Sequence, residues 1–182
     1  MSQYIQEKIP SEILPQLWNL YEKESQNYHN DFIVSTYFPQ YIKNNDIQDL
    51  LIKSKRIMDM YGFKFKCSDQ ELLDSEKPSN IDYLVEFHLY KINGLLRSSF
   101  GRHSDDQAAV STNVNTIIFY LEKDKTVDGG NLIVYDRDSS EKKMLEIKSG
   151  TMVILKGDVE HEIEEMDGKG ERKSIVVQIQ RD

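Results

Sequence analysis

The stretch GTMVILKGDVEH, residues 150–161, contains a short apolar run between two glycines and ends in a histidine. Apolar runs of this length bounded by glycine are typical of β-strands. The chain from residue 81 onward has the same texture, with turn signals such as Asn93-Gly94 and Asp128-Gly129-Gly130 between the runs. Many short strands at close spacing predict an all-β sandwich or barrel. The candidate strands are Tyr83–Ile92, Thr116–Leu121, Asn131–Tyr135, Lys143–Ile147, Thr151–Leu155, Glu160–Glu165 and Lys173–Gln180.

Helical patterns precede the strands. Ser11 can cap a helix that continues to Tyr21, and a second helix begins near Asn45 or Asp46, with apolar residues at helical spacing. The alternating segment 61–67 predicts a half-buried strand, and residues 24–31 and 68–80 predict loops. We therefore expect a mainly β (α+β) fold: a jelly roll (double-stranded β-helix) buttressed by N-terminal helices. Residues 1–182 form one domain in this interpretation, with helical support and a loop in 1–80 and the jelly-roll core in 81–182.

Composition limits the function classes. The length of 182 residues suits one domain, and the formal net charge of −8 disfavours nucleic acid and anionic membrane surfaces as partners. Cys67 is the only cysteine, so no intramolecular disulfide forms and a reducing compartment is expected. The first residues lack the pattern of a signal peptide, and no apolar run is long enough to span a bilayer. These features predict a cytoplasmic protein and leave the oligomeric state open.

Three residues form a candidate metal site. His103 and Asp105 are two residues apart, so in extended chain both side chains point to the same side of a sheet. His161, at the end of the apolar strand, supplies a second imidazole. Two histidines and one carboxylate make the facial triad of non-haem Fe(II) sites. Each residue also has an ordinary structural explanation: a polar turn residue for His103, a turn cap for Asp105, and a buried hydrogen-bonded histidine for His161. Asp106 is the rival carboxylate, but alternation points it away from His103.

The set His103-x-Asp105, distal His161 and Arg172 resembles the 2-oxoglutarate/Fe(II)-dependent dioxygenases, most closely their prolyl-hydroxylase-like branch. The similarity extends from Tyr83 to the end of the chain. It implies that Fe(II) is held by the three ligands, that 2-oxoglutarate chelates the iron, and that O2 binds beside it. Succinate and CO2 are then released while a substrate C–H bond is hydroxylated.

The resemblance also implies residues for the co-substrate. Arg172 would take the distal carboxylate of 2-oxoglutarate through its planar fork, although an ion pair with one of the nearby glutamates is the alternative. Ser174 shares its face and would add a hydroxyl. Tyr120 matches the family tyrosine that reaches the co-substrate, and Tyr90 resembles the tyrosine upstream of the metal motif. Both tyrosines have simple strand packing as the alternative, and His88, on the face of Tyr90, is expected to be a pocket or core histidine.

The substrate is the least constrained part of the interpretation. The size and the Gly129-Gly130 turn favour protein prolyl (or other side-chain) hydroxylation, and a free amino acid or other small molecule is the alternative. The nucleic-acid demethylases of the superfamily resemble this chain in the triad but carry a second arginine six residues after the first. Here that position is Gln178, so no nucleic-acid substrate is expected. A non-oxidative cupin-like binding protein or isomerase, or a scaffold that acts only through partners, stays open as a different class.

Overall fold

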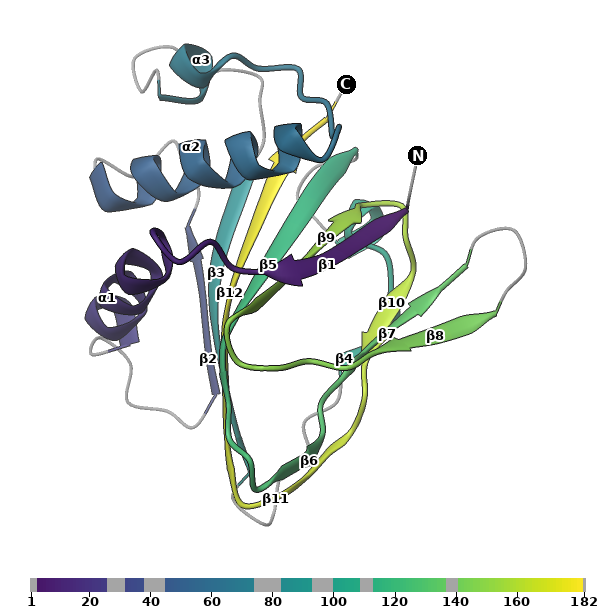
Figure 1. The fold of residues 1–182 in the computed structure, drawn as a ribbon. Helices are drawn as coiled ribbons and strands as arrows, with labels where there is room; N and C mark the ends of the chain where they lie inside the picture. The colour runs from purple at the N-terminus through teal and green to yellow at the C-terminus, as the bar shows by residue number, and fades with distance from the viewer. Residues whose placement is uncertain are drawn as a thin grey trace.

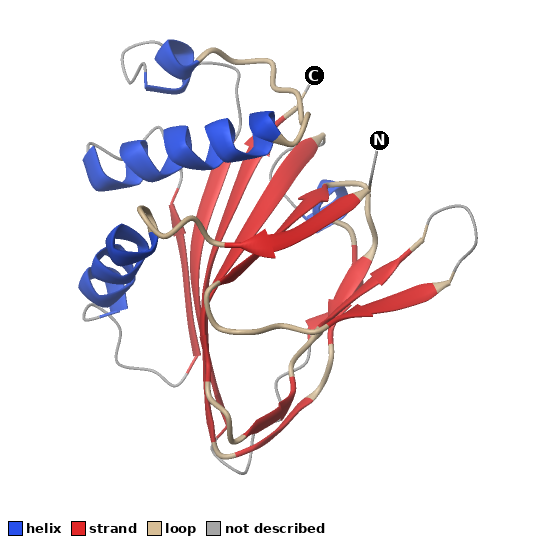
Figure 2. Cartoon of the chain, viewed as in Figure 1, coloured by secondary structure: helices blue, strands red, loops and turns tan. Residues whose placement is uncertain are grey.

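Two β-sheets face each other, and the helices cover the outer face of the larger sheet (Figures 1 and 2). The structure is a computed structural model that describes residues 3–25, 32–37, 45–73, 83–92, 100–108, 113–136 and 141–181. This arrangement confirms the prediction of a mainly β jelly roll with helices packed against one side.

All strand pairings within the described residues are antiparallel. The six-stranded sheet has the order β1 (Tyr4–Lys8), β9 (Thr151–Lys156), β5 (Val114–Lys123), β12 (Gly170–Gln180), β3 (Tyr83–Ile92) and β2 (Phe32–Tyr37). The four-stranded sheet has the order β4 (Phe100–His103), β10 (His161–Ile163), β7 (Leu132–Tyr135) and β8 (Lys142–Leu145). A separate ribbon pairs β6 (Val127–Gly129) with β11 (Met166–Gly168).

Side-chain alternation divides the core into two parts. On β5, Ile117 and Phe119 point outward to the helices, whereas Ile118 and Tyr120 point inward to the smaller sheet. The register between β5 and β12 shifts after Tyr120, because Ser174 lies opposite Tyr120 while Lys173 lies opposite Glu122. The residues of the large sheet that point toward the smaller sheet, such as Ile118, Tyr120 and Val176, form what we call the inner wall.

The two long helices are confirmed. Helix α1 (Leu14–Ser25) begins after a turn in which the Ile13 and Leu14 amides donate to the Pro10 carbonyl, so its start is later than a cap at Ser11 predicts. Helix α2 (Asn45–Met60) buries the expected stripe of Ile47, Leu50, Leu51, Ile57 and Met58. The loop predicted at 24–31 is wrong in its first two residues, which end α1, and its remainder, with His29, lies outside the described residues.

The segment 1–80 is not only helical. Strands β1 and β2 form the two edges of the large sheet, where β1 pairs with β9 and β2 pairs with β3. Polar residues in Tyr4–Lys8 hid the first strand from pattern analysis, because an edge strand on a half-exposed surface has no clear alternation.

The strand predicted at 61–67 is wrong. The chain there leaves α2 through a turn in which the Gly62 and Phe63 amides donate to carbonyls of the last helical turn. Phe63 and Cys67 are buried, Phe65 is half-buried, and Lys64 and Lys66 between them are exposed, so the burial alternates, but no strand pairs with this segment in the described chain. Alternation alone does not make a strand when the neighbouring partner is missing.

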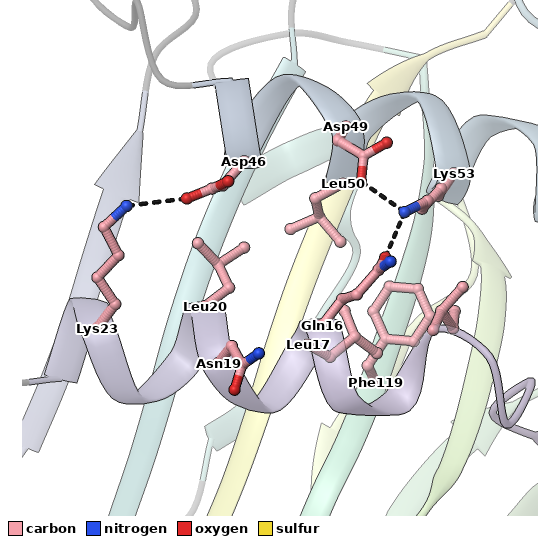
Figure 3. Close-up of a pocket in the computed structure, with 11 residues that line it drawn as sticks. Gln16, Leu17, Asn19, Leu20, Lys23, Asp46, Asp49, Leu50, Lys53 and Phe119 are labelled. Carbon is pink, nitrogen blue, oxygen red and sulfur yellow. Dashed lines mark hydrogen bonds and ion pairs between the residues drawn. The ribbon is translucent and has the colours of Figure 1, made fainter.

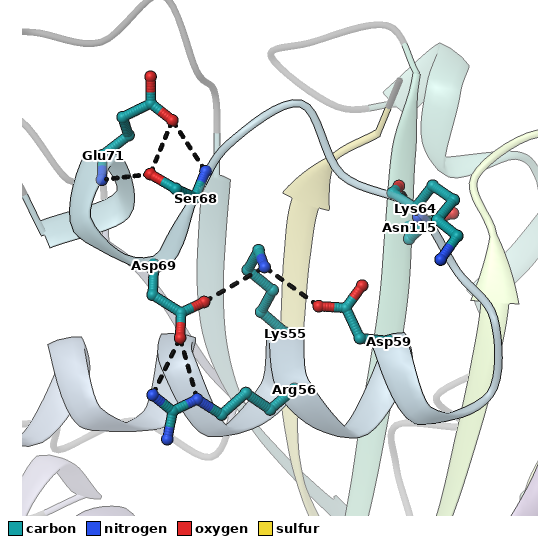
Figure 4. A network of polar contacts seen from close by, with 8 residues as sticks. All are labelled: Lys55, Arg56, Asp59, Lys64, Ser68, Asp69, Glu71 and Asn115. Atoms are coloured by element: carbon teal, nitrogen blue, oxygen red, sulfur yellow. Dashed lines mark hydrogen bonds and ion pairs between the residues drawn. The ribbon is translucent and has the colours of Figure 1, made fainter.

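The loop predicted at 68–80 contains a short helix, α3 (Asp69–Leu73), and its residues 74–80 lie outside the described residues. Ser68 and Glu71 form a capping box, since the Glu71 amide donates to the Ser68 hydroxyl and Glu71 Oε2 accepts from the Ser68 amide (Figure 4). Asp69 joins this helix to α2 through ion pairs with Lys55 and Arg56. Burial alone raises the pKa of Asp69, but hydrogen bonds from the arginine and the lysine outweigh it and hold this pKa below its ordinary value.

Candidate active site

The three predicted metal ligands meet at one point of the fold. His103 ends β4, Asp105 begins the short helix α4 (Asp105–Ala108), and His161 begins β10. Asp105 Oδ1 lies 3.8 Å from Nε2 of His103 and 3.7 Å from Nε2 of His161. One possible ligand atom from each residue lies within 4.8 Å of the others. Two imidazole nitrogens and a carboxylate oxygen on one side of a centre fit the donor set of a facial Fe(II) triad.

Each histidine is oriented by its own backbone. Nδ1 of His103 lies 2.7 Å from the Gly101 carbonyl, and Nδ1 of His161 lies 3.0 Å from the Val159 carbonyl. A carbonyl only accepts, so each Nδ1 carries the proton and donates it. In the neutral ring with its proton on Nδ1, Nε2 carries the lone pair that a metal ligand requires, and both Nε2 atoms lie on the side of Asp105 Oδ1.

The Asp105 carboxylate accepts a hydrogen bond that the sequence did not reveal. The Thr116 hydroxyl on β5 donates to Asp105 Oδ2 at 2.5 Å, and both residues are buried. That bond occupies one carboxylate oxygen and leaves Oδ1 toward the imidazoles. The expectation that His103 and Asp105 share one extended strand is wrong, because Asp105 lies in α4; the helix start, rather than strand alternation, brings its carboxylate to the histidines.

Asp106, the rival carboxylate, has a different role. Its Oδ1 accepts from the Val114 amide at 2.8 Å, and its Oδ2 pairs with Arg181 at 3.1 Å. Arg181 also pairs with Asp158, three residues before His161. These contacts join the start of α4 to the turn that leads into β10, so they tie together the segments that carry two of the candidate ligands.

Arg172 is 1% exposed and lies on the inner face of β12. Its Nη1 donates to the Gly130 carbonyl at 2.7 Å, and its guanidinium lies 5.6 Å from the centroid of the Tyr120 ring. The Gly129-Gly130 turn makes this contact possible: both glycines have positive φ, and a Cβ at Gly129 would lie 2.1 Å from the Glu165 carbonyl oxygen. A surface ion pair of Arg172 with a neighbouring glutamate, the alternative reading, does not fit this burial.

Of the other residues predicted to contact the co-substrate, the structure describes the side chains of Tyr120 and Ser174 but not that of Tyr90. Tyr120 is 1% exposed and lies opposite Ser174 on the neighbouring strand, so both point inward. The backbone of Tyr90 lies on β3 opposite Arg172, but its side chain lies outside the described residues, as does the side chain of His88.

Lys123 is a further basic residue on this wall that pattern analysis missed. Because of the register shift in β5, it lies opposite Arg172 and its ammonium group is 3.4 Å from Asn131 Oδ1. Burial lowers the pKa of Lys123, and the positive charge of Arg172 acts in the same direction, against the opposing effect of the Glu164 carboxylate. No sequence signal predicts that Lys123 faces inward, since a bulge changes which residues of a strand face inward.

A cavity of about 390 Å³ lies elsewhere, between α1 and α2 (Figure 3). An ion pair of 2.8 Å between Lys23 and Asp46 joins the two helices at this cavity. Phe119, which lines the cavity, projects from the outer face of β5, whereas Thr116 and Tyr120 belong to the inner face. The cavity and the three candidate metal ligands are therefore on opposite faces of the large sheet.

A family model described as the 2OG-Fe(II) oxygenase superfamily matches residues 86–180. The chain is also similar to solved structures at low identity. A prolyl-4-hydroxylase of Pseudomonas putida gives a TM-score of 0.64 at 16% identity and covers 99% of this chain and 93% of that one. A prolyl hydroxylase of Trichoplax adhaerens, in complex with a peptide fragment of hypoxia inducible factor, gives 0.57 at 14% identity, with 98% and 84% covered.

The epimerase SnoN, in complex with Fe3+, alpha ketoglutarate and nogalamycin RO, gives a TM-score of 0.63 at 10% identity, with 98% of this chain and 79% of that one covered. Identities this low establish a common fold. A search of curated protein sequences returned no match. Among the described helices, none combines the length and the apolar character needed to cross a membrane.

Proposed function

Because the chain belongs to the 2OG-Fe(II) oxygenase superfamily, whose members use Fe(II), 2-oxoglutarate and O2, we propose that it hydroxylates a C–H bond of a protein prolyl or other side chain. The observation that carries this proposal is the convergence of His103, Asp105 and His161 within 4.8 Å, together with a buried arginine on the inner face of the large sheet. We also infer that segment 1–80 supports the core 81–182 within one domain, since β1 and β2 extend the sheet of the core.

In this proposal His103, Asp105 and His161 hold the iron. Bound Fe(II) supplies the oxidative chemistry, which couples decarboxylation of 2-oxoglutarate to succinate and CO2 with oxidation of the substrate. The protein contributes orientation. The two backbone carbonyls fix the imidazoles, and the Thr116 hydroxyl fixes the carboxylate in the geometry that keeps Oδ1 toward the histidines.

Arg172 is the counter-ion for the distal carboxylate of 2-oxoglutarate. A guanidinium offers two parallel donors to a carboxylate, and burial strengthens such charge-assisted bonds. Gly130 holds the guanidinium from one side and the Tyr120 ring lies beside it, so its direction is set before a ligand binds. Tyr120, Tyr90 and Ser174 are the proposed neighbours of the co-substrate, and the apolar inner core formed around Ile118 and Val176 limits access of water.

The prolyl side chain is preferred because hydroxylases of prolyl residues share the fold along nearly the whole chain. A small molecule or a free amino acid is the second candidate, favoured by the comparable TM-score of 0.63 to SnoN, whose structure is a complex with nogalamycin RO. Both candidates use the same iron and co-substrate residues and differ only in the organic substrate.

The decisive experiment is an anaerobic titration of the purified protein with Fe(II) and 2-oxoglutarate, which should produce the visible charge-transfer absorption of the ternary complex. Succinate formation in air should follow, and His103→Ala and Asp105→Ala should abolish both signals. Asp59→Ala, which removes an ion-paired aspartate of α2 on the outer side, is the control and should change neither. Wild-type turnover in both ligand variants would exclude the proposal. Peptide and amino-acid libraries screened for a gain of one oxygen atom then identify the substrate.

A further inference from the structure

One buried polar group on the inner wall is not used by the proposed iron and co-substrate residues. Gln178 is 6% exposed, and its carbonyl oxygen Oε1 is fully buried without a hydrogen bond from any residue that the structure describes. A buried acceptor without a donor is destabilising and rare in folded proteins. An unsatisfied carbonyl oxygen at this position is accounted for if a bound ligand supplies the missing hydrogen-bond donor.

The position of Gln178 places it beside the metal side of the site. On β12, Gln178 follows Arg172, Ser174 and Val176 in the inward-facing row, because Ile175 and Val177 belong to the outer core and Val176 to the inner one. Across the ladder it lies opposite Thr116, whose hydroxyl donates to Asp105. Side chains of directly paired residues are neighbours on one face of a sheet. The Gln178 carboxamide is thus next to the bond that holds the candidate ligand Asp105.

The same row separates Gln178 from the co-substrate anchor. Arg172 and Gln178 are six residues apart on one strand, which corresponds to roughly 20 Å between their Cα atoms. A five-carbon diacid anchored at Arg172 extends toward the iron from one end of this row, and Gln178 lies at the other end. In addition, 2-oxoglutarate carries acceptors only, and an acceptor does not satisfy a carbonyl oxygen.

We propose that Gln178 is a substrate-binding residue, whose Oε1 accepts a hydrogen bond from an N–H or O–H group of the organic substrate next to the reacting carbon. This inference rests on the proposed function. It selects substrates that bring a donor, such as an amide, ammonium or hydroxyl group, to this wall. A substrate that presents only apolar or acceptor groups there leaves the carbonyl unsatisfied and binds more weakly.

The test compares two buried amides. Gln178→Met removes the carboxamide and keeps the length of the side chain. Asn115→Leu is the matched control, because Asn115 is equally buried on β5 but its Nδ2 donates to the Lys64 carbonyl at 3.0 Å. The midpoint of thermal unfolding of each apoprotein is measured, followed by the 2-oxoglutarate dependence of the charge-transfer absorption in the Fe(II) complex.

We expect the unfolding midpoint to rise by about 2–6 °C in Gln178→Met, because an unsatisfied acceptor is removed, and to fall in Asn115→Leu, because a satisfied bond is lost. The 2-oxoglutarate dissociation constant of Gln178→Met should stay within about twofold of wild type. A lower midpoint in Gln178→Met shows that the carbonyl has a structural partner and overturns the proposal. A rise in the midpoint with tenfold weaker 2-oxoglutarate binding assigns Gln178 to the co-substrate and also overturns it.

Failure of the proposed function is distinguishable from these outcomes. If wild type gives no charge-transfer absorption, the oxygenase assignment fails and the substrate role of Gln178 fails with it. If wild type gives the absorption and Gln178→Met is destabilised, only the role of Gln178 is lost.

Discussion

The Thr116 hydroxyl offers a direct measure of how the protein fixes a metal ligand. Thr116→Val replaces the hydroxyl by a methyl group of similar volume and removes the bond of 2.5 Å to Asp105 Oδ2. Both residues are buried, so water does not replace the lost donor. A hydrogen bond to a charged group is worth about 1.5–3 kcal/mol, which corresponds to roughly a 10- to 100-fold loss of metal affinity.

The assay is an anaerobic titration of Fe(II), or of Co(II) with its visible absorption, into wild type and Thr116→Val. Thr151→Val is the matched control, because the Thr151 hydroxyl donates to the Lys148 carbonyl at 2.6 Å on the neighbouring strand β9, and Thr151 is not among the metal-binding residues. The control should bind the metal like wild type. Equal affinity in Thr116→Val, or an equal loss in both variants, would refute the idea that the hydroxyl prepares Asp105 for coordination.

Three further outcomes are expected. Arg172→Met should weaken 2-oxoglutarate binding by roughly 100-fold and leave the Co(II) titration unchanged, since it removes the two charge-assisted bonds that we propose for the distal carboxylate, away from the candidate metal ligands. Arg181→Met, which breaks the pair with Asp106, should weaken Co(II) binding about tenfold, whereas Lys173→Met, which removes an ion pair on the outer face of β12, should not. The pKa of Asp69 is lower in the folded protein than in the unfolded chain, so its contribution to stability is present at neutral pH and is lost as the pH falls below about 4. Urea midpoints of wild type and Asp69→Asn should therefore differ at pH 7 and converge in acid; a difference that persists in acid would contradict the assignment.

The second half of the fold was predictable because its strands carry their own signals. Glycine turns and apolar runs gave β5, β7, β9 and β12 close to their observed bounds. The short strand β4 and the ribbon of β6 and β11 were missed, since glycines and charged residues occupy most of these segments and leave no apolar run. Helix α3 carries the capping-box signal Ser68-x-x-Glu71, which the acidic character of the segment concealed.

The candidate ligands were predictable from residue type and spacing, and the structure brings all three together. The supporting residues were not, because they depend on tertiary register. Thr116 lies on β5, eleven residues after Asp105, and no residue pattern signals the hydrogen bond between them; Lys123 faces inward only because the β5 register shifts. Sequence patterns give the period of a strand, but they do not show where a bulge changes its phase.

The backbone bonds of the two imidazoles have a consequence for how the protein takes up its ion. Each ring is tied to a carbonyl two residues earlier in its own chain segment, so the coordinating nitrogens are arranged without help from the metal. In small zinc domains, by contrast, the metal supplies the energy of folding. Here chelators should remove the iron and leave the circular dichroism spectrum unchanged. Added metal should raise the midpoint of thermal unfolding only because it binds the folded state, by an amount that depends on metal concentration.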